Sequence, residues 1–242
     1  MTARLFISDL HLDATRPRAT AAFRRFLKTQ AREAERLYIL GDLFEFWIGD
    51  DDDASHSVEV LDAIAEYTGA GFRCSVMRGN RDFLLGADFA RRTGTDLLPD
   101  PTVETLFGQR VLIMHGDLLC TDDKAYQRYR RIVNKPLLQT LFLACPRAWR
   151  RAAGTEGRRR SRNHTNSRPT MIMDVNPAAV RAALQANATA ILLHGHTHRP
   201  AIHRLDIGGQ AASRIVLGDW YEQGSVLRWT AQGFELSSLP FA

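Results

Sequence analysis

Five short, largely apolar segments, each followed at once by polar residues, constrain the fold of this 242-residue chain more than any other feature. They end at Ile7, Leu40, Met77, Met114 and Leu193. Short continuous apolar runs of this kind are typical of strands that are buried on both faces of a sheet. Patterns with helical spacing lie between them, at about 23–31, 58–65 and 180–184. Strands that alternate with helices predict an α/β layered core, and the Gly-rich sequence after Pro200 predicts an antiparallel meander.

The residues that follow these segments are potential metal ligands: Asp9 with His11, Asp42, Asn80, His115, and His196 with His198. In open α/β folds, ligands bind outside this end of the strands. Seven oxygen and imidazole donors can hold two divalent cations, and Asp42 is the natural bridge because a carboxylate has two oxygens. A mixed donor set of this kind favours Mn, Fe, Zn or Co over Mg or Ca.

Each of these motifs taken alone is more typical of a turn, a helix cap or a buried, hydrogen-bonded histidine. Five of them in order at successive strand ends favour a metal site instead. Two cations about 3.5–4 Å apart can activate a water molecule and hold a phosphate during in-line displacement. The pattern therefore predicts a dinuclear centre suited to phosphoryl chemistry.

A basic segment stands out against an acidic remainder. Residues 124–168 carry 13 Lys and Arg against one acid, a net charge of +12, so the rest of the chain carries 5 − 12 = −7. Such a segment is suited to binding the phosphates of nucleic acid, of a membrane surface or of a substrate. Apolar residues with helical spacing on either side of Pro136 predict two short amphipathic helices. We expect a single domain over residues 1–242, with a basic helical lid inserted at about 124–168.

The sequence offers no signal for a membrane span or for export. No stretch approaches the roughly 20 apolar residues that a bilayer requires, and Asp9 interrupts the only apolar run near the N-terminus. Three cysteines without CxxC spacing favour reduced thiols, so a cytoplasmic location is expected. We interpret the acidic run at 50–53 as a solvated loop or a helix N-terminal signal, not a metal site.

The ordered motifs resemble those of the calcineurin-like metallophosphoesterases, and residues 40–52, 79–85, 115–123 and 194–200 resemble one subfamily, the UDP-2,3-diacylglucosamine diphosphatases of lipid A biosynthesis. The resemblance implies a four-layer αββα sandwich with two Mn²⁺ ions. It implies one ion on Asp9, His11, Asp42 and His198, and the other on Asp42, Asn80, His115 and His196. The implied reaction cleaves the pyrophosphate of UDP-2,3-diacylglucosamine into UMP and 2,3-diacylglucosamine 1-phosphate.

The same resemblance implies substrate contacts from a further set: Asn80, Arg81, Asp123, Ser161, Thr165, Arg168 and His196. Arg168 stands where the subfamily usually carries Lys. Arg81 stands where most of the superfamily carries a histidine that protonates the leaving group, and arginine cannot donate a proton at neutral pH. A phosphate monoester, with a second pKa near 6, departs without protonation, so Arg81 favours anhydride substrates.

We expect water activated by the metals to attack the uridine-side phosphorus, with Arg81 and Asn80 as catalytic residues that neutralise charge on the transferred phosphate. A structural ion pair of Arg81 with Asp82 or Asp117 is the alternative. The expected partners are the lipid-linked nucleotide and the anionic inner-membrane surface, to which a cytoplasmic monomer would attach peripherally.

Two other functions remain open from the sequence. One is another phosphoesterase of the superfamily that acts on nucleotides or nucleic acid, although few aromatic residues lie among the arginines of the lid. The other is a metal-free scaffold that binds anionic membranes, against which the complete ligand set argues. We expect no nucleic-acid partner.

Overall fold

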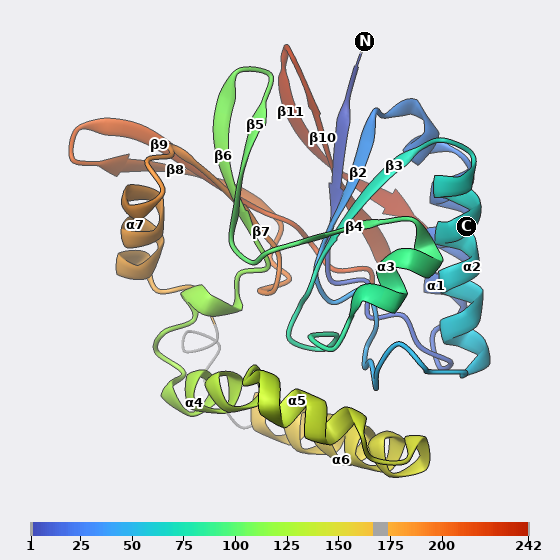
Figure 1. Ribbon diagram of the computed structural model, residues 1–242. Helices are drawn as coiled ribbons and strands as arrows, with labels where there is room; N and C mark the ends of the chain where they lie inside the picture. The colour runs from blue at the N-terminus through green and yellow to red at the C-terminus, as the bar shows by residue number, and fades with distance from the viewer. Residues whose placement is uncertain (1, 167–173, 242) are drawn as a thin grey trace.

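The computed structural model describes residues 2–166 and 174–241, and it consists of two β-sheets packed face to face with helices on both outer faces (Figure 1). The six-stranded sheet has the order β11-β10-β1-β2-β3-β4, and the five-stranded sheet has the order β5-β6-β7-β9-β8. The layers therefore run helix, sheet, sheet, helix, which confirms the predicted four-layer α/β sandwich.

The strands of the first sheet are β1 (Arg4–Ile7), β2 (Arg36–Leu40), β3 (Arg73–Met77), β4 (Asp96–Leu98), β10 (Gln223–Thr230) and β11 (Gly233–Pro240). Those of the second are β5 (Thr102–Leu106), β6 (Gln109–Met114), β7 (Ile191–His194), β8 (Ala201–Ile207) and β9 (Gln210–Val216). β1 to β4 are parallel neighbours, as are β6, β7 and β9. All five predicted strands are present, and their carboxyl ends lie at one edge of the sandwich.

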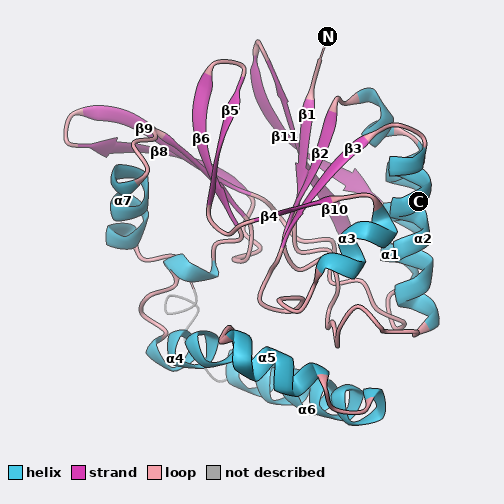
Figure 2. Ribbon diagram, viewed as in Figure 1, coloured by secondary structure: helices cyan, strands magenta, loops and turns pink. Residues whose placement is uncertain are grey.

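Helices cover the outer face of each sheet (Figure 2). They are α1 (Pro17–Lys28), α2 (Ser55–Gly69) and α3 (Ala87–Thr93) on one side, and α7 (Pro177–Ala186) on the other. A proline opens both α1 and α7, where its missing N–H costs no hydrogen bond. The buried face of α1 includes Phe23, Phe26 and Leu27, as the helical spacing predicts. A separate apolar core, which includes Phe6, Tyr38 and Trp229, lies between the two sheets.

The four strands after Pro200 do not form one meander, so that prediction is wrong. They form two antiparallel hairpins, β8–β9 in the second sheet and β10–β11 in the first. β9 pairs in parallel with β7, and β10 pairs with β1. The chain crosses between the sheets over residues 217–222, close to the strand ends.

The basic segment forms three helices that lie below the sandwich in Figure 1: α4 (Lys124–Val133), α5 (Pro136–Leu143) and α6 (Arg147–Asn166). A short 3₁₀ turn, η2 (Asp117–Leu119), leads into them, and a second one, η1 (Gln30–Glu33), follows α1. Large apolar side chains on these helices are exposed, with Leu137 at 71% and Trp149 at 74%. Most of the apolar stripe therefore faces away from the core, although Phe142 of α5 packs against it.

The acidic run at 50–53 anchors two helices. Asp50 accepts hydrogen bonds from the backbone N–H groups of Gly86, Asp88 and Phe89 at the start of α3, so one residue of the run does lie at a helix N-terminus. The other three carboxylates pair with arginines of α6: Asp51 with Arg150, Asp52 with Arg151, and Asp53 with Arg147 and Arg151. Part of the positive charge of the lid is thus neutralised by carboxylates of the same chain.

Candidate dinuclear metal centre

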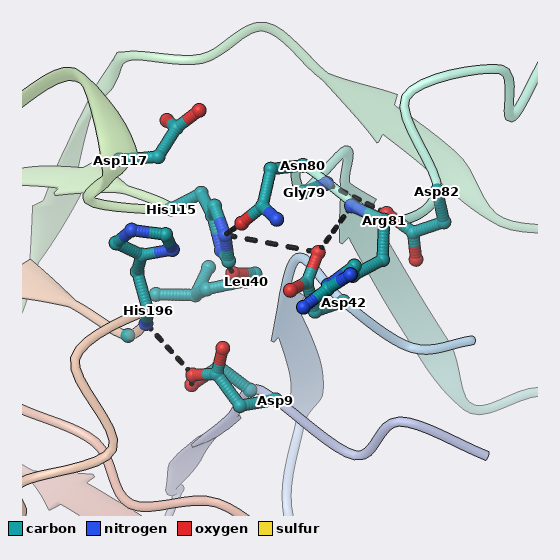
Figure 3. A network of polar contacts seen from close by, with 12 residues as sticks. Asp9, Leu40, Asp42, Gly79, Asn80, Arg81, Asp82, His115, Asp117 and His196 are labelled. Atoms are coloured by element: carbon teal, nitrogen blue, oxygen red, sulfur yellow. Dashed lines mark hydrogen bonds and ion pairs between the residues drawn. The ribbon is translucent and has the colours of Figure 1, made fainter. Parts of the chain in front are cut away.

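The loops after five strands bring the predicted ligands together at one edge of the sandwich, and Figure 3 shows most of them. Asp9 and His11 follow β1, Asp42 follows β2, Asn80 follows β3, His115 follows β6, and His196 and His198 follow β7. Five of these residues have positive φ angles, which non-glycine residues rarely adopt: Asp9, His11, Asp42, His196 and His198. Strained backbone of this kind persists where the surroundings hold a functional side chain in place.

The first group of donor atoms comes from Asp9, His11 and His198, whose ligating atoms all lie within 4.8 Å of one another. The Nε2 atoms of His11 and His198 are 3.2 Å apart, and Asp9 Oδ1 is 3.4 Å from His198 Nε2. Asp9 Oδ1 is buried without a hydrogen-bond partner, whereas Oδ2 accepts from the hydroxyl of Ser8 and the backbone N–H of His196. An orphaned carboxylate oxygen beside two converging imidazole nitrogens fits a bound cation.

The second group consists of Asp9, Asp42 and His115. His115 Nε2 lies 3.7 Å from Asp42 Oδ1 and 2.9 Å from Asn80 Oδ1. The other oxygen of Asp42, Oδ2, lies 3.7 Å from His11 Nε2 in the first group. One carboxylate therefore faces both groups, which fits the bridging position expected for Asp42. His196 completes this side, with its ring centroid 5.0 Å from that of His115.

Three of the imidazole rings are oriented by contacts between their Nδ1 atoms and oxygen atoms of neighbouring residues. His115 Nδ1 donates to the Leu40 carbonyl oxygen at 2.9 Å. His11 Nδ1 lies 3.0 Å from Glu45 Oε2, and His198 Nδ1 lies 3.4 Å from Asp219 Oδ2. Such outer contacts turn the opposite Nε2 toward the centre and make it a better ligand.

The electrostatics of the centre favour positive charge. Burial by itself would lower the pKa of His115, but the carboxylates of Asp42, Asp9 and Asp117 together raise that pKa to about 9. Burial lowers the pKa of His196 to about 3, so this ring is neutral and free to offer a lone pair.

Two glycines allow the loops to approach each other closely. A Cβ added to Gly79 would lie 2.1 Å from Asp42 Oδ1, and one added to Gly41 would lie 2.5 Å from His115 Nδ1. Asp82 fixes the same loops, because its carboxylate accepts from the backbone N–H groups of Leu43 and Gly79. A larger residue at either glycine would displace a ligand.

Arg81 lies beside Asp42, to whose Oδ1 its backbone N–H donates at 2.8 Å (Figure 3). The alternative structural partners are occupied by other groups: Asp82 holds backbone N–H groups, and Asp117 pairs with Arg130. Within the described residues the guanidinium of Arg81 makes no hydrogen bond or ion pair. It is therefore available to an anion at the centre.

The remaining predicted substrate residues lie on or near the helical segment. The carboxylate of Asp123 is almost buried and caps α4, accepting from the backbone N–H of Tyr126 at 3.0 Å. Ser161 and Thr165 belong to α6, but their side chains lie outside the described part of the structure. Arg168 lies outside the described residues.

A network that sequence reasoning missed ties α4 to the centre. Asp117 Oδ2 accepts from the Tyr126 hydroxyl at 2.7 Å and from Arg130 Nε at 2.5 Å. Arg130 also reaches Asp100, whose carboxylate accepts from the backbone N–H of His115. A cavity of about 240 Å³ lies between this network and the ends of β3 and β4. The helical segment thus begins directly beside the ligands that follow β3 and β6.

Comparison with known proteins agrees with this geometry. Residues 4–200 match the family model "Calcineurin-like phosphoesterase". The chain is similar to proteins named UDP-2,3-diacylglucosamine hydrolase: 52% identical to that of Stenotrophomonas maltophilia, with 97% of this chain and 98% of the relative covered, and 51% identical to that of Escherichia coli O81, with 99% and 100% covered. The relative from Serratia proteamaculans is 48% identical, with 98% and 99% covered.

Among solved structures, an archaeal phosphodiesterase superposes with a TM-score of 0.51 at 12% identity, covering 98% of this chain and all of that one. At this level of identity the similarity concerns the fold alone. It agrees with the four-layer architecture described above.

Proposed function

Because the chain belongs to the calcineurin-like phosphoesterase family, we propose that it hydrolyses the pyrophosphate bond of UDP-2,3-diacylglucosamine, with UMP and 2,3-diacylglucosamine 1-phosphate as products. The observation that carries this proposal is an identity of 48–52% over nearly the full length to relatives named for this hydrolase. The convergent donor groups support it, since they suit a metal-dependent hydrolase.

In this proposal Asp9, His11, Asp42 and His198 would hold one divalent cation, and Asp42, Asn80, His115 and His196 a second, with Mn²⁺ as the native metal. Bound cations of this kind supply Lewis acidity and lower the pKa of a water molecule. The chain's own residues provide the frame: Glu45, Asp219 and the Leu40 carbonyl hold the imidazole rings in position.

In this proposal Arg81 and Asn80 neutralise negative charge on the phosphate that is transferred. The oxygen of a water molecule forms a bond to the uridine-side phosphorus, the water releases its proton to solvent, and the bond from that phosphorus to the bridging oxygen breaks. The electron pair leaves on the sugar phosphate, which needs charge stabilisation but no proton from the enzyme. Among the described residues the guanidinium of Arg81 has no partner, and its position next to Asp42 suits this role.

The helical segment supports a lipid substrate, and we propose that α4–α6 form a lid over the acyl chains. Apolar side chains on α4, α5 and α6 are exposed: Tyr129, Ile132, Leu137, Leu138, Leu141, Leu143 and Trp149. This number of exposed apolar side chains on three consecutive helices favours contact with an apolar partner. Asp123, Ser161, Thr165 and Arg168 would bind the glucosamine 1-phosphate beneath it.

The same exposed side chains, with the basic residues of the segment, support peripheral attachment of a monomeric, cytoplasmic enzyme to the anionic inner-membrane surface. Within residues 2–166 and 174–241, none of the helices has the length and apolar character that crossing a bilayer requires. Attachment would therefore depend on the exposed apolar and basic side chains of the lid.

A nucleic-acid substrate is not favoured. Three arginines of α6 that could form a basic face, Arg147, Arg150 and Arg151, are engaged by carboxylates of residues 51–53. The curated relatives carry a lipid-nucleotide name instead.

The test compares three substrates with the Mn²⁺-loaded protein: UDP-2,3-diacylglucosamine, its deacylated counterpart UDP-glucosamine, and single-stranded DNA. We expect UMP release from the first and a large loss of kcat/KM without the acyl chains. Cleavage of DNA with no hydrolysis of the lipid nucleotide would overturn the proposal. Hydrolysis in oxygen-18 water should label UMP, and label in the sugar phosphate would refute attack on the uridine-side phosphorus.

A further inference from the structure

A second cavity, of about 560 Å³, opens beside the metal centre on the side of β10 and β11. It lies among residues 218–225, at the crossing between the sheets and the start of β10, and residues 236–238 of β11. Two residues join it to the centre: Asp219 Oδ2 is 3.4 Å from His198 Nδ1, and the Tyr221 ring stacks on His11 with centroids 5.4 Å apart. A ligand in this cavity would therefore lie next to the first donor group.

The chemistry of the lining restricts what can bind. The described residues around the cavity include two carboxylates, Asp219 and Glu222, and no lysine, arginine or histidine. This lining disfavours a phosphate or another anion, because like charges repel at close range. The rest of the lining is mixed: the hydroxyl of Ser238 and the amide of Gln223 lie beside apolar groups that include Leu236. Such a lining suits a ligand with both polar groups and an apolar face better than a wholly apolar acyl chain, which would leave the polar groups without partners. The cavity suits a neutral ligand with hydroxyl and N–H donors.

Tyr221 gives this cavity an aromatic wall held in a fixed position. Its side chain is about half exposed, with 47% of the residue accessible. The guanidinium of Arg16 lies 4.3 Å from the ring centroid and also donates to the carbonyl oxygens of Leu10 and His11. An immobilised, partly exposed aromatic ring loses little entropy when a flat, polar ring packs against it.

The position of the cavity relative to the metal centre further restricts which part of a substrate can bind there. In the first sheet β10 and β11 lie on one side of β1 and β2, whereas β3 and β4 lie on the other. The cavity beside α4, lined in part by Asn80 and Tyr126, is on the β3 side. Two cavities thus flank the donor groups, an arrangement that fits a substrate with a pyrophosphate in its middle and unlike groups at its ends.

We infer that the cavity bounded by Asp219, Tyr221, Ser225 and Ser238 receives the nucleoside half of the substrate, with carboxylates for the ribose hydroxyls and Tyr221 against the base. The inference rests on the proposed function for the identity of the nucleotide. The volume of this cavity, about 560 Å³, falls within the range of about 300–1,000 Å³ that is usual for small-molecule sites. The lipid half then extends in the opposite direction, towards α4.

The inference is tested with a substitution that fills the cavity. Ser238 lies on β11 opposite Ser225 of β10 and lines the cavity, so Ser238→Trp places a bulky side chain inside it. Glu235→Trp on the same strand is the matched control, because Glu235 is exposed and does not line the cavity. Calorimetry measures the binding of UMP to each Mn²⁺-loaded protein, hydrolysis of UDP-2,3-diacylglucosamine gives KM and kcat, and metal analysis measures Mn²⁺ content.

We expect Ser238→Trp to weaken UMP binding and raise KM by at least about tenfold at unchanged Mn²⁺ content, with Glu235→Trp close to the wild type. Wild-type affinity for UMP in Ser238→Trp, or no binding of UMP to the wild type, would overturn the inference. UMP binding that depends on the cavity, without hydrolysis of the lipid nucleotide, would instead overturn the proposed function alone.

Discussion

Replacing Arg150 by alanine should detach α6 from the sandwich. Arg150 is only 2% exposed, and its guanidinium donates to the Ile48 carbonyl at 2.6 Å and the Cys145 carbonyl at 2.9 Å, and to both oxygens of Asp51. The buried bond from a charged donor to Ile48 contributes about 1.5–3 kcal/mol. Asp51 is more than half exposed, so solvent screening limits that pair to at most about 1 kcal/mol.

Together these contacts predict a loss of about 2–4 kcal/mol in the free energy of unfolding for Arg150→Ala. Urea denaturation followed by circular dichroism measures the loss, and limited proteolysis shows whether cleavage begins in α6. The matched control is Arg147→Ala on the same helix, whose pair with Asp53 is exposed on both sides and should contribute about 0–1 kcal/mol. Equal stabilities of the two variants would refute the reasoning that Arg150 is the buried anchor.

Three further outcomes follow from the structure. Glu45→Gln should weaken binding of one of two Mn²⁺ ions by about 10- to 100-fold, because it removes the carboxylate beside His11. Isothermal titration calorimetry should show one weakened site, and two unchanged sites would contradict this expectation. Gly79→Ala should abolish metal binding in a protein that still folds, since its Cβ would lie 2.1 Å from Asp42 Oδ1; full Mn²⁺ content by metal analysis would count against it. At about pH 8 iodoacetamide should label Cys145 alone, because burial raises the pKa of the Cys74 and Cys120 thiols to about 12. Three labelled thiols in the mass spectrum of the folded protein would show that Cys74 and Cys120 are not buried.

The strands and the donor residues could be predicted because both follow from local pattern. An apolar strand that ends in a polar residue places that residue at the sheet edge, whatever the rest of the chain does. The sequence therefore indicates Asp42 and His115 as members of one site, and the structure brings them to 3.7 Å.

The outer contacts could not be predicted, because they join residues whose proximity depends on tertiary packing. Glu45 lies in the loop after β2, and Asp219 lies at the crossing between the sheets, far along the chain from the histidine that each contacts. The same reason explains why the expected single meander was wrong. Short Gly-separated strands indicate hairpins but do not tell which sheet each hairpin joins.

The helical segment presents less basic surface than its net charge indicates. The arginines of α6 and the acidic run at 51–53 are almost a hundred residues apart, and only the fold pairs them. Net charge within a segment therefore sets an upper limit on the charge that the segment presents to a partner.

The most direct test of the account measures UMP release from UDP-2,3-diacylglucosamine by the metal-depleted protein, with and without added Mn²⁺, beside the variant Asp42→Ala. Asp42 faces both donor groups, so its loss should impair both cation sites together. We expect release that depends on Mn²⁺ in the wild type and is lost in the variant. Metal-independent release, or undiminished release by Asp42→Ala, would contradict it.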